Sequence, residues 1–542
     1  MQFNLKALTV QFSFNQKRID GIQNFFERHN KLIIFTILSL VSIISYLYFL
    51  ANGLGLAYND ARSHLDIARR VVENLQPGFA QLGSVWLPLP HLLATITVWN
   101  NFMWHSGLSG ALESMVSYVA TGILIYQILK VLNVSLMGRL IGVIIFATNL
   151  NILYMQSTAM TELLLLGTMT AGVYELIQWH NDDNMLRLVK SSFWIMLSTM
   201  IRYDGWFLLG FATILIVIQA YRKHGYKTAE GVFFLFTTLA SFGILLWIIW
   251  NWIIFKDPLY FIFGPYAAAT QQQQIASAGL LTTEHNLPFS IKSYIYSVIY
   301  NEGMLQTILA VIGMGLFWLD KKISGSIKMA SIALLAPFFF NILALYLGQS
   351  VLFVQGLNGN SWFNVRYGLM MAPTIAIFVG YLVYRVKNIK YILVLLVFFV
   401  MFFSFVNRDA VTIDDAIYGA SGKNVTQVSG WLNHNASNTP GFVLISVASH
   451  DAIIFSSGLQ MSRFIHEGDG LYWTLATTHP AHWARWIVLR TNDLSDQTFK
   501  LLRNNKEFRN DYVLIGKYPF ADVYEIKPQY VKYLHTKPFA KI

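Results

Sequence analysis

The chain has 542 residues, of which 55% are hydrophobic and only 12% are charged, and it contains no cysteine. So few charges cannot keep so much apolar surface in water, which excludes a soluble enzyme and a disordered chain and favours a polytopic helical membrane protein. The lack of cysteine excludes disulfides, thiol catalysis and Cys-ligated zinc. The net charge of +11 reflects membrane topology rather than nucleic-acid binding, because of where the basic residues lie.

The N-terminal segment, residues 1–31, is polar and basic and leads into an apolar run, Leu32 to Leu50. That run is about long enough to cross ~30 Å of hydrocarbon. We expect it to be a signal anchor rather than a cleavable signal peptide, with its basic end in the cytoplasm. Ten more apolar runs give about eleven expected transmembrane helices in an all-α membrane bundle. They cover residues 108–130, 138–155, 159–179, 188–201, 205–221, 231–254, 303–319, 329–347, 367–384 and 391–406.

The basic residues alternate between successive loops. With the N-terminus inside, the cytoplasmic segments hold 18 Lys and Arg, the opposite loops hold 7, and the remaining 14 follow residue 406. The positive-inside rule therefore predicts a multi-pass protein of the cytoplasmic (inner) membrane. Because the number of spans is odd, the chain after residue 406 is expected on the outer face.

Residues 407–542 have the mixed composition of a soluble domain, so the chain divides into a membrane domain (1–406) and a small outer α/β domain (407–542). Two buried strands, two helices and one hairpin around Pro519 are predicted there. The strands are Gly441–Val447 and Ala484–Arg490, the helices are Val425–Asn433 and Ser495–Asn504, and the hairpin is Asp511–Lys527.

The first outer loop, residues 51–106, carries a dense polar cluster that begins directly after the first span. Asp60 and His64 are four residues apart, so they share one face of a helix, and the amphipathic pattern predicts a helix on the membrane surface. Asp60 is the candidate catalytic carboxylate, and Arg62 and His64 are candidate substrate contacts. His64 could instead make a structural bond. His91, in a turn-rich segment, is a further candidate, with capping or packing as the alternative.

Three more charged segments lie at the outer ends of predicted spans. A charged residue at bilayer depth costs ~2.5–3.5 kcal/mol of insertion free energy, so it usually faces a cavity or a partner. Glu162 begins an apolar helix, which it could simply cap. Arg202 and Asp204 lie between two spans and could pair with neighbours. Arg366, followed by Tyr367, lies at the mouth of another span and could be a snorkelling anchor. All five are candidate substrate-binding residues.

Acids, a histidine and two arginines on one face suit sugar transfer from a lipid-linked phosphate. Arginine binds an anionic leaving group through permanently charged, bidentate contacts, and a carboxylate can take the proton of the acceptor. No D-x-D triplet, Walker loop or G-x-G-x-x-G motif points to a soluble nucleotide substrate.

Several segments resemble the GT-C superfamily of membrane glycosyltransferases, and most closely its ArnT and protein O-mannosyltransferase branch. The likeness covers roughly residues 30–405 and is carried by YNDARSHLDIARRV (58–71), PGFAQLGSVWLPLPHLL (77–93), MTELLLL (160–166), RYDGW (202–206) and NVRYGLMMAP (364–373). The resemblance implies a many-helix bundle with surface helices in the first outer loop, an outer C-terminal domain, and a catalytic acid that by the match is Asp60.

The chain departs from two patterns of the superfamily. Protein O-mannosyltransferases carry an adjacent Asp-Glu pair at the catalytic position, whereas Asp60 is flanked by Asn59 and Ala61. Oligosaccharyltransferases carry a W-W-D motif and bind a divalent metal, and this chain has no W-W-D. A divalent metal ion therefore stays open but is not indicated, and no other cofactor is implied.

The expected function is transfer of a sugar from a polyprenyl-phosphate donor to a lipid, glycan or protein acceptor on the outer face. The expected partners are these substrates and membrane lipids, with no nucleic acid. A lipid-linked oligosaccharide ligase or polymerase is an alternative that the sequence does not separate. A lipid or solute transporter is disfavoured, because the polar residues lie on one side of the membrane only and no internal repeat is present.

Overall fold

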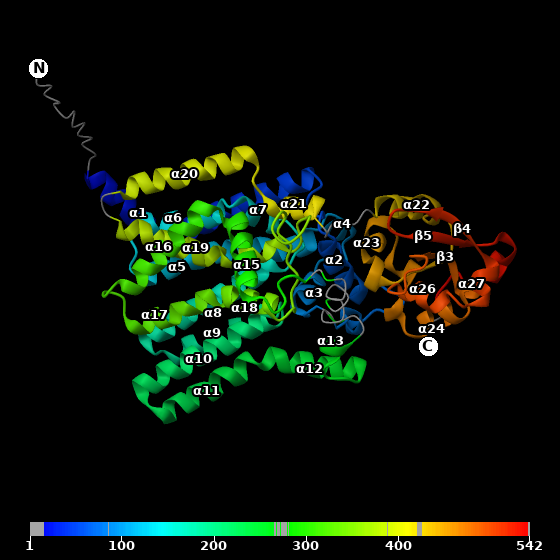
Figure 1. Ribbon diagram of the computed structural model, residues 1–542, viewed down its shortest axis with the longest axis horizontal. Helices are drawn as coiled ribbons and strands as arrows, with labels where there is room; N and C mark the ends of the chain where they lie inside the picture. The colour runs from blue at the N-terminus through cyan, green and yellow to red at the C-terminus, as the bar shows by residue number, and fades with distance from the viewer. Residues whose placement is uncertain are drawn as a thin grey trace, which may run out of the picture.

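The computed structural model describes residues 16–84, 86–264, 267, 272, 279, 281–386, 389–419 and 425–539. The first fifteen residues of the basic N-terminal segment lie outside the described residues. The molecule is elongated (Figure 1), with a bundle of long helices at one end and a smaller α/β region, residues 425–539, at the other. This is the fold class that the sequence predicts.

The bundle is built from helices that run mostly along the long axis of Figure 1. They are α1 (Gln16–Ala51), α5 (Leu108–Val131), α6 (Leu136–Ala147), α7 (Leu150–Met155), α8 (Glu162–Asp182), α9 (Met185–Thr199), α10 (Asp204–His224), α11 (Tyr226–Ala240), α12 (Phe242–Phe255), α13 (Tyr260–Phe263), α15 (Leu287–Glu302), α16 (Met304–Leu319), α17 (Gly325–Ser331), η2 (Ile332–Leu335), α18 (Ala336–Tyr346), η3 (Val365–Met371), α19 (Ala372–Arg385) and α20 (Lys390–Asn407).

Among the described residues, six helical segments are long and apolar enough to cross a membrane, and two bent helix pairs raise the number to eight. The bent pairs are α11 with α12 and α15 with α16. All eleven predicted runs fall on helices, but α6, α8 and α9 do not meet the same criteria. By length and apolar composition, eight of the eleven predicted spans therefore meet these criteria, as single segments or bent pairs. Helix α8 shows why a predicted span can miss them: it is buried on nearly all sides, so it faces other helices rather than lipid and need not be apolar.

The first outer loop folds into α2 (Asn59–Val72), η1 (Phe79–Leu82), α3 (Leu89–Ala94) and α4 (Asn101–His105). Helix α2 packs against α3 and α5 on one side and against α23 of the α/β region on the other. Nine of its residues are buried, including Asp66, Arg69 and Arg70. The α/β region thus covers the charged face of this helix, and Asp451 pairs with Arg70 at 3.1 Å.

The α/β region contains one five-stranded sheet in the order β2-β1-β3-β5-β4. Strand β1 pairs in parallel with β2 and β3, and β5 pairs antiparallel with β3 and β4. The strands are β1 (Phe442–Leu444), β2 (Phe464–Ile465), β3 (Ala484–Leu489), β4 (Tyr512–Lys517) and β5 (Asp522–Ile526), and the helices are α22 (Thr426–Ala436), α23 (Val447–Ser457), α24 (Leu471–Thr478), α25 (Pro480–Trp483), α26 (Gln497–Leu502) and α27 (Lys506–Asp511). The two strands, two helices and hairpin predicted from sequence are confirmed at these positions.

One short helix returns to the bundle between the last span and the sheet. Helix α21 (Val411–Tyr418) packs against α7 and η3. Asn151 of α7 anchors it, since its side chain accepts hydrogen bonds from the Thr412 backbone N–H (3.0 Å) and hydroxyl (2.9 Å). This contact brings Asp415 next to η3. The basic turns between α10 and α11 and between α16 and α17 lie at the far end of the bundle (Figure 1).

Candidate active site

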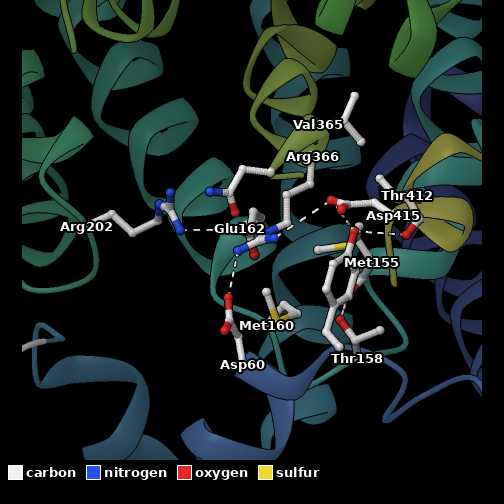
Figure 2. Close-up of polar contacts among 12 residues, drawn as sticks. Asp60, Met155, Thr158, Met160, Glu162, Arg202, Val365, Arg366, Thr412 and Asp415 are labelled. Carbon is white, nitrogen blue, oxygen red and sulfur yellow. Dashed lines mark hydrogen bonds and ion pairs between the residues drawn. The ribbon is translucent and has the colours of Figure 1, made fainter. Parts of the chain in front are cut away.

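Six charged residues meet where the bundle adjoins the α/β region: Asp60, Glu162, Arg202, Asp204, Arg366 and Asp415. Figure 2 shows Glu162 between Arg202 and Arg366, with Asp60 reaching Arg366 from one side and Asp415 from another. Three of the cluster's acids lie in the first turn of a helix: Asp60 in α2, Glu162 in α8, and Asp204 in α10. A carboxylate is stabilised there by the helix dipole. Capping of α8 by Glu162 and its place in the cluster are therefore compatible.

Two glycines allow the backbone to carry the arginines into the cluster. A Cβ on Gly205 would lie 2.3 Å from the Ser198 carbonyl carbon, so the turn between α9 and α10 that presents Arg202 closes only around glycine. A Cβ on Gly368 would lie 2.4 Å from the Ser297 carbonyl oxygen. Glycine there lets η3, and with it Arg366, approach α15.

A single oxygen of Glu162 holds both arginines. Oε1 accepts hydrogen bonds from Arg366 Nε at 2.9 Å and from Arg202 Nη1 at 3.2 Å. Glu162 has no exposed surface, and within the described part of the chain its Oε2 is buried without a hydrogen-bond partner. A carboxylate so enclosed cannot exchange with solvent, so it sets the positions of the two guanidinium groups.

Arg366 is the centre of the cluster and is almost fully enclosed. Its side chain is 4% exposed; Nη2 donates to Asp60 Oδ2 at 2.8 Å, and Nη1 lies 3.9 Å from Asp415 Oδ2. The guanidinium carbon also lies 4.9 Å from the centre of the Tyr58 ring, a cation–π contact. These contacts offset the free-energy cost of burying the Arg366 charge. A snorkelling anchor would extend toward water, whereas the Arg366 side chain is enclosed.

Solvent reaches the cluster at Asp60 and Arg202. Their side chains are 39% and 23% exposed, far more than those of Arg366 and Glu162. Arg202 also contacts Asp204 at 3.4 Å, and its guanidinium lies 5.1 Å from the centre of the Tyr367 ring. The structure therefore places a partly exposed carboxylate and a partly exposed cation on two sides of a buried ion pair.

Arg62 turns away from the cluster. Its Nε donates to the Leu56 carbonyl at 3.0 Å and its Nη1 to Ser456 Oγ at 3.3 Å. Asp60 pairs with Arg366 at 2.8 Å, although Arg62 is much closer to it in the sequence. Arg62 follows Asp60 by two positions, and because consecutive residues of a helix point about 100° apart, its side chain leaves α2 about 200° around the helix from that of Asp60.

His64 and His91 form their own buried pair beside the cluster. His64 Nδ1 and His91 Nε2 are 2.8 Å apart, and the His64 ring packs against Trp86 with 4.3 Å between ring centres. Burial, together with the charges of Arg202 and Arg366, lowers the pKa of His64 to about 3, so this imidazole is neutral at ordinary pH. His91 is 1% exposed, which fits the packing alternative given for it.

Sequence reasoning missed two residues of the cluster, Asp415 and Tyr58. The Tyr58 hydroxyl bonds to the Thr412 carbonyl at 2.8 Å and to Asp415 Oδ2 at 3.1 Å. The signal that could have revealed Asp415 is its position: it follows the last span closely, as Asp60 follows the first. Among the described residues, no group of three His, Asp or Glu side chains has the arrangement of a metal site.

Comparison with known proteins rests on structure alone, because no family model and no curated protein matches the sequence. The crystal structure of ArnT from Cupriavidus metallidurans bound to undecaprenyl phosphate superposes with a TM-score of 0.57 at 9% identity, covering 93% of this chain and 99% of that one. The oligosaccharyltransferase AglB from Archaeoglobus fulgidus, in complex with an inhibitory peptide and a dolichol-phosphate, gives 0.49 at 11% identity over 86% and 70% of the two chains. From its apolar helices and its likeness to ArnT, the chain is a multi-pass membrane protein with the GT-C fold, the fold of membrane glycosyltransferases.

Proposed function

We propose that this protein is a membrane glycosyltransferase that moves a sugar from a polyprenyl-phosphate carrier to an acceptor at the outer face of the membrane. The observation that carries the proposal is the exposed Asp60 carboxylate, held at 2.8 Å by the buried Arg366, beside the accessible Arg202. The GT-C fold supports the same reaction class, and the undecaprenyl phosphate bound to ArnT supports a polyprenyl-phosphate donor.

Asp60 serves as the base in this mechanism. The acceptor oxygen or nitrogen forms a bond to the anomeric carbon of the donor sugar, the bond from that carbon to the phosphate oxygen breaks, and polyprenyl phosphate leaves. The acceptor proton passes to Asp60, whose Oδ2 is oriented by Arg366. Because Arg366 is fixed in turn by Glu162, the base is positioned before substrate arrives, and this lowers the cost of reaching the transition state.

Arg202 is the cation offered to the donor phosphate. Its side chain is 23% exposed, whereas that of Arg366 is 4% exposed and already surrounded by three carboxylates. Glu162 and Asp204 partly neutralise Arg202, so its attraction for a phosphate is weakened by these neighbours. We therefore expect the apolar polyprenyl chain to supply most of the donor affinity, and Arg202 to orient the phosphate and stabilise it as it leaves.

The test uses the full chain in lipid nanodiscs with polyprenyl-phosphate donors carrying radiolabelled hexoses or pentoses, and a membrane glycolipid extract as acceptor. Label should enter the extract from at least one monosaccharide donor. Arg202→Ala should lower kcat/KM, while Arg222→Ala, an exposed arginine at the far end of α10, should leave it unchanged. Transfer from a pyrophosphate-linked oligosaccharide alone would favour the ligase instead. No transfer from any donor would overturn the proposal.

A further inference from the structure

A polar cleft borders the cluster of charged residues around Arg366, here called the ion-pair cluster. It has a volume of about 270 Å³ and is lined by Gln355, Asn360, Ser361, Trp362, Asp414 and Tyr418. This is slightly below the ~300–1,000 Å³ of typical small-molecule sites. It therefore suits one or two sugar rings rather than a whole lipid.

One wall of the cleft is a loop with a defined shape. Phe353 and Phe363 exchange backbone hydrogen bonds of 2.9 and 3.1 Å, which closes the loop into a short antiparallel bridge. The Asn358 side chain fastens the loop from within, accepting from the Val354 N–H at 2.6 Å and donating to the Leu352 carbonyl at 2.7 Å. Trp362 packs edge-on against Tyr300, with 5.0 Å between ring centres. A ligand entering this cleft would meet positioned groups and would not have to order the loop.

The chemistry of the cleft is that of a carbohydrate site. Two aromatic rings, two side-chain amides, a hydroxyl and a carboxylate line it. Among the described residues, none of the polar side chains that line it forms a side-chain hydrogen bond or ion pair with another protein group. The set therefore offers unused donors and acceptors for hydroxyl groups, and its rings offer flat apolar faces with polar edges.

The charge of the lining residues restricts which sugars the cleft can bind. Asp414 is the only ionisable acid or base among the six lining residues apart from the Tyr418 phenol, and no Lys or Arg lines the cleft. A phosphate or uronate would meet a carboxylate with no cation to balance it, which disfavours binding. A neutral sugar can donate a hydroxyl to Asp414, and an amino sugar can form a charge-assisted hydrogen bond with it.

The cleft shares its walls with the candidate active site. Trp362 lies on the loop that leads into η3, which carries Arg366, and Asp414 directly precedes Asp415 on α21. Asp415 turns inward to Tyr58 and Arg366, while Asp414 faces the cleft. The two sites therefore lie on opposite sides of the same two segments.

We infer that this cleft is an acceptor subsite that binds a neutral or amino-bearing sugar unit of a glycan against the two segments that also carry Arg366 and Asp415. The inference rests on the proposed function, because it names the acceptor class of the same enzyme. The donor is not the occupant, since the cleft carries no cation for a phosphate and is open to solvent: Tyr418 is 76% exposed.

The binding test uses the full chain in nanodiscs and an array of neutral hexose oligomers, glucosamine oligomers and uronate oligomers. Neutral or amino oligomers should bind and uronates should not. Tyr418→Ala should weaken binding about 3- to 10-fold, the effect of one aromatic contact. Tyr226→Ala, which removes an equally exposed tyrosine (68%) from the start of α11, is the matched control. Presenting the same sugars free and as glycolipid head groups distinguishes a soluble glycan from a membrane glycolipid as the source.

A kinetic test separates this inference from the proposed function. Tyr418→Ala and Asp414→Asn should raise KM for the glycan acceptor and leave water-dependent release of sugar from the donor unchanged, since neither residue touches the ion-pair cluster. Two results would overturn the acceptor subsite: transfer with the wild-type acceptor KM in both variants, or uronate binding equal to neutral-sugar binding. Neither result would contradict the proposed glycosyltransferase activity. The wild type could instead bind glycans, lose that binding in Tyr418→Ala and transfer no sugar from any donor. This result would support the cleft as a sugar-binding site and overturn the proposed glycosyltransferase activity.

Discussion

Asp60 Oδ2 lies 2.8 Å from Arg366 Nη2, although the two residues are 306 positions apart in the chain. Asp60 is partly open to solvent and Arg366 is enclosed. The pair therefore has an inner half that is fixed by the protein and an outer half that can meet substrate. This asymmetry makes Asp60, rather than the buried acids around it, the residue suited to proton transfer.

Asp60→Asn should lower kcat by ~10²–10⁴-fold, the usual contribution of a positioned base. The amide keeps the shape and can still accept from Arg366 through its oxygen, so expression and the unfolding midpoint should change little. Radiolabel transfer in nanodiscs measures the effect, with the exposed Asp409→Asn as the control. Near-normal turnover in Asp60→Asn would show that Asp60 is only an ion-pair partner of Arg366.

Glu162→Gln should impair both stability and activity, because the buried oxygen that aligns Arg202 and Arg366 loses its charge. Breaking a buried pair costs ~3–5 kcal/mol, and we expect the lower end because Arg366 retains Asp60 and Asp415. Glu175→Gln on the same helix is the matched control: Glu175 pairs at 3.0 Å with Arg187, whose side chain is 30% exposed, so its neutralisation should cost less than that of Glu162. Thermal unfolding in detergent compares the two. Equal stability losses would contradict the positioning role of Glu162.

The contact between α2 and the α/β region should weaken as pH rises. Burial and the neighbouring Asp451 raise the pKa of Asp66 well above its usual range, so the folded state holds a proton that the unfolded state releases. Stability is then lost as pH rises from about 4 through the raised pKa, at up to ~1.4 kcal/mol per pH unit. His466, also buried at this contact, has a pKa lowered well below its usual value. This lowered pKa has the opposite effect: it adds stability as pH rises, and the gain is complete by about pH 6.5, the ordinary pKa of histidine.

Asp66→Asn tests this pH dependence. Asparagine can still accept the 3.2 Å hydrogen bond from Trp104 Nε1 and can donate to Asp451 at any pH. As pH rises from about 4 through the raised pKa of Asp66, the unfolding midpoint of the wild type should fall relative to that of the variant. Parallel pH curves for the two proteins would contradict the assignment of the extra proton to this pair.

The topology prediction is tested with reporters. Alkaline phosphatase fused after Ile542 should be active, and the same reporter fused after His224, at the basic turn between α10 and α11, should be inactive. The reason is the charge split between alternate loops together with the position of the basic turns far from the α/β region (Figure 1). The reverse pattern of activities would invert the orientation of the protein.

The sequence by itself determined the class of the protein, the places of its apolar helices and the strands of its α/β region. These follow from local composition and periodicity, as at Ala484–Leu489, where a largely apolar run became the central strand. It also placed Asp60, Glu162, Arg202 and Arg366 at the same face, because span parity alone assigns loops to a side of the membrane.

Only the tertiary structure decided which of these residues touch. Arg62 and Asp60 are two positions apart yet point to different partners, and Asp415 joins the cluster because Asn151 anchors α21 to the bundle. The same holds for α2: Arg70 could face water by its place in the sequence, but Asp451 of the α/β region pairs with it. A charge pattern shows that a polar partner is needed, whereas long-range packing determines whether water or a distant side chain provides it.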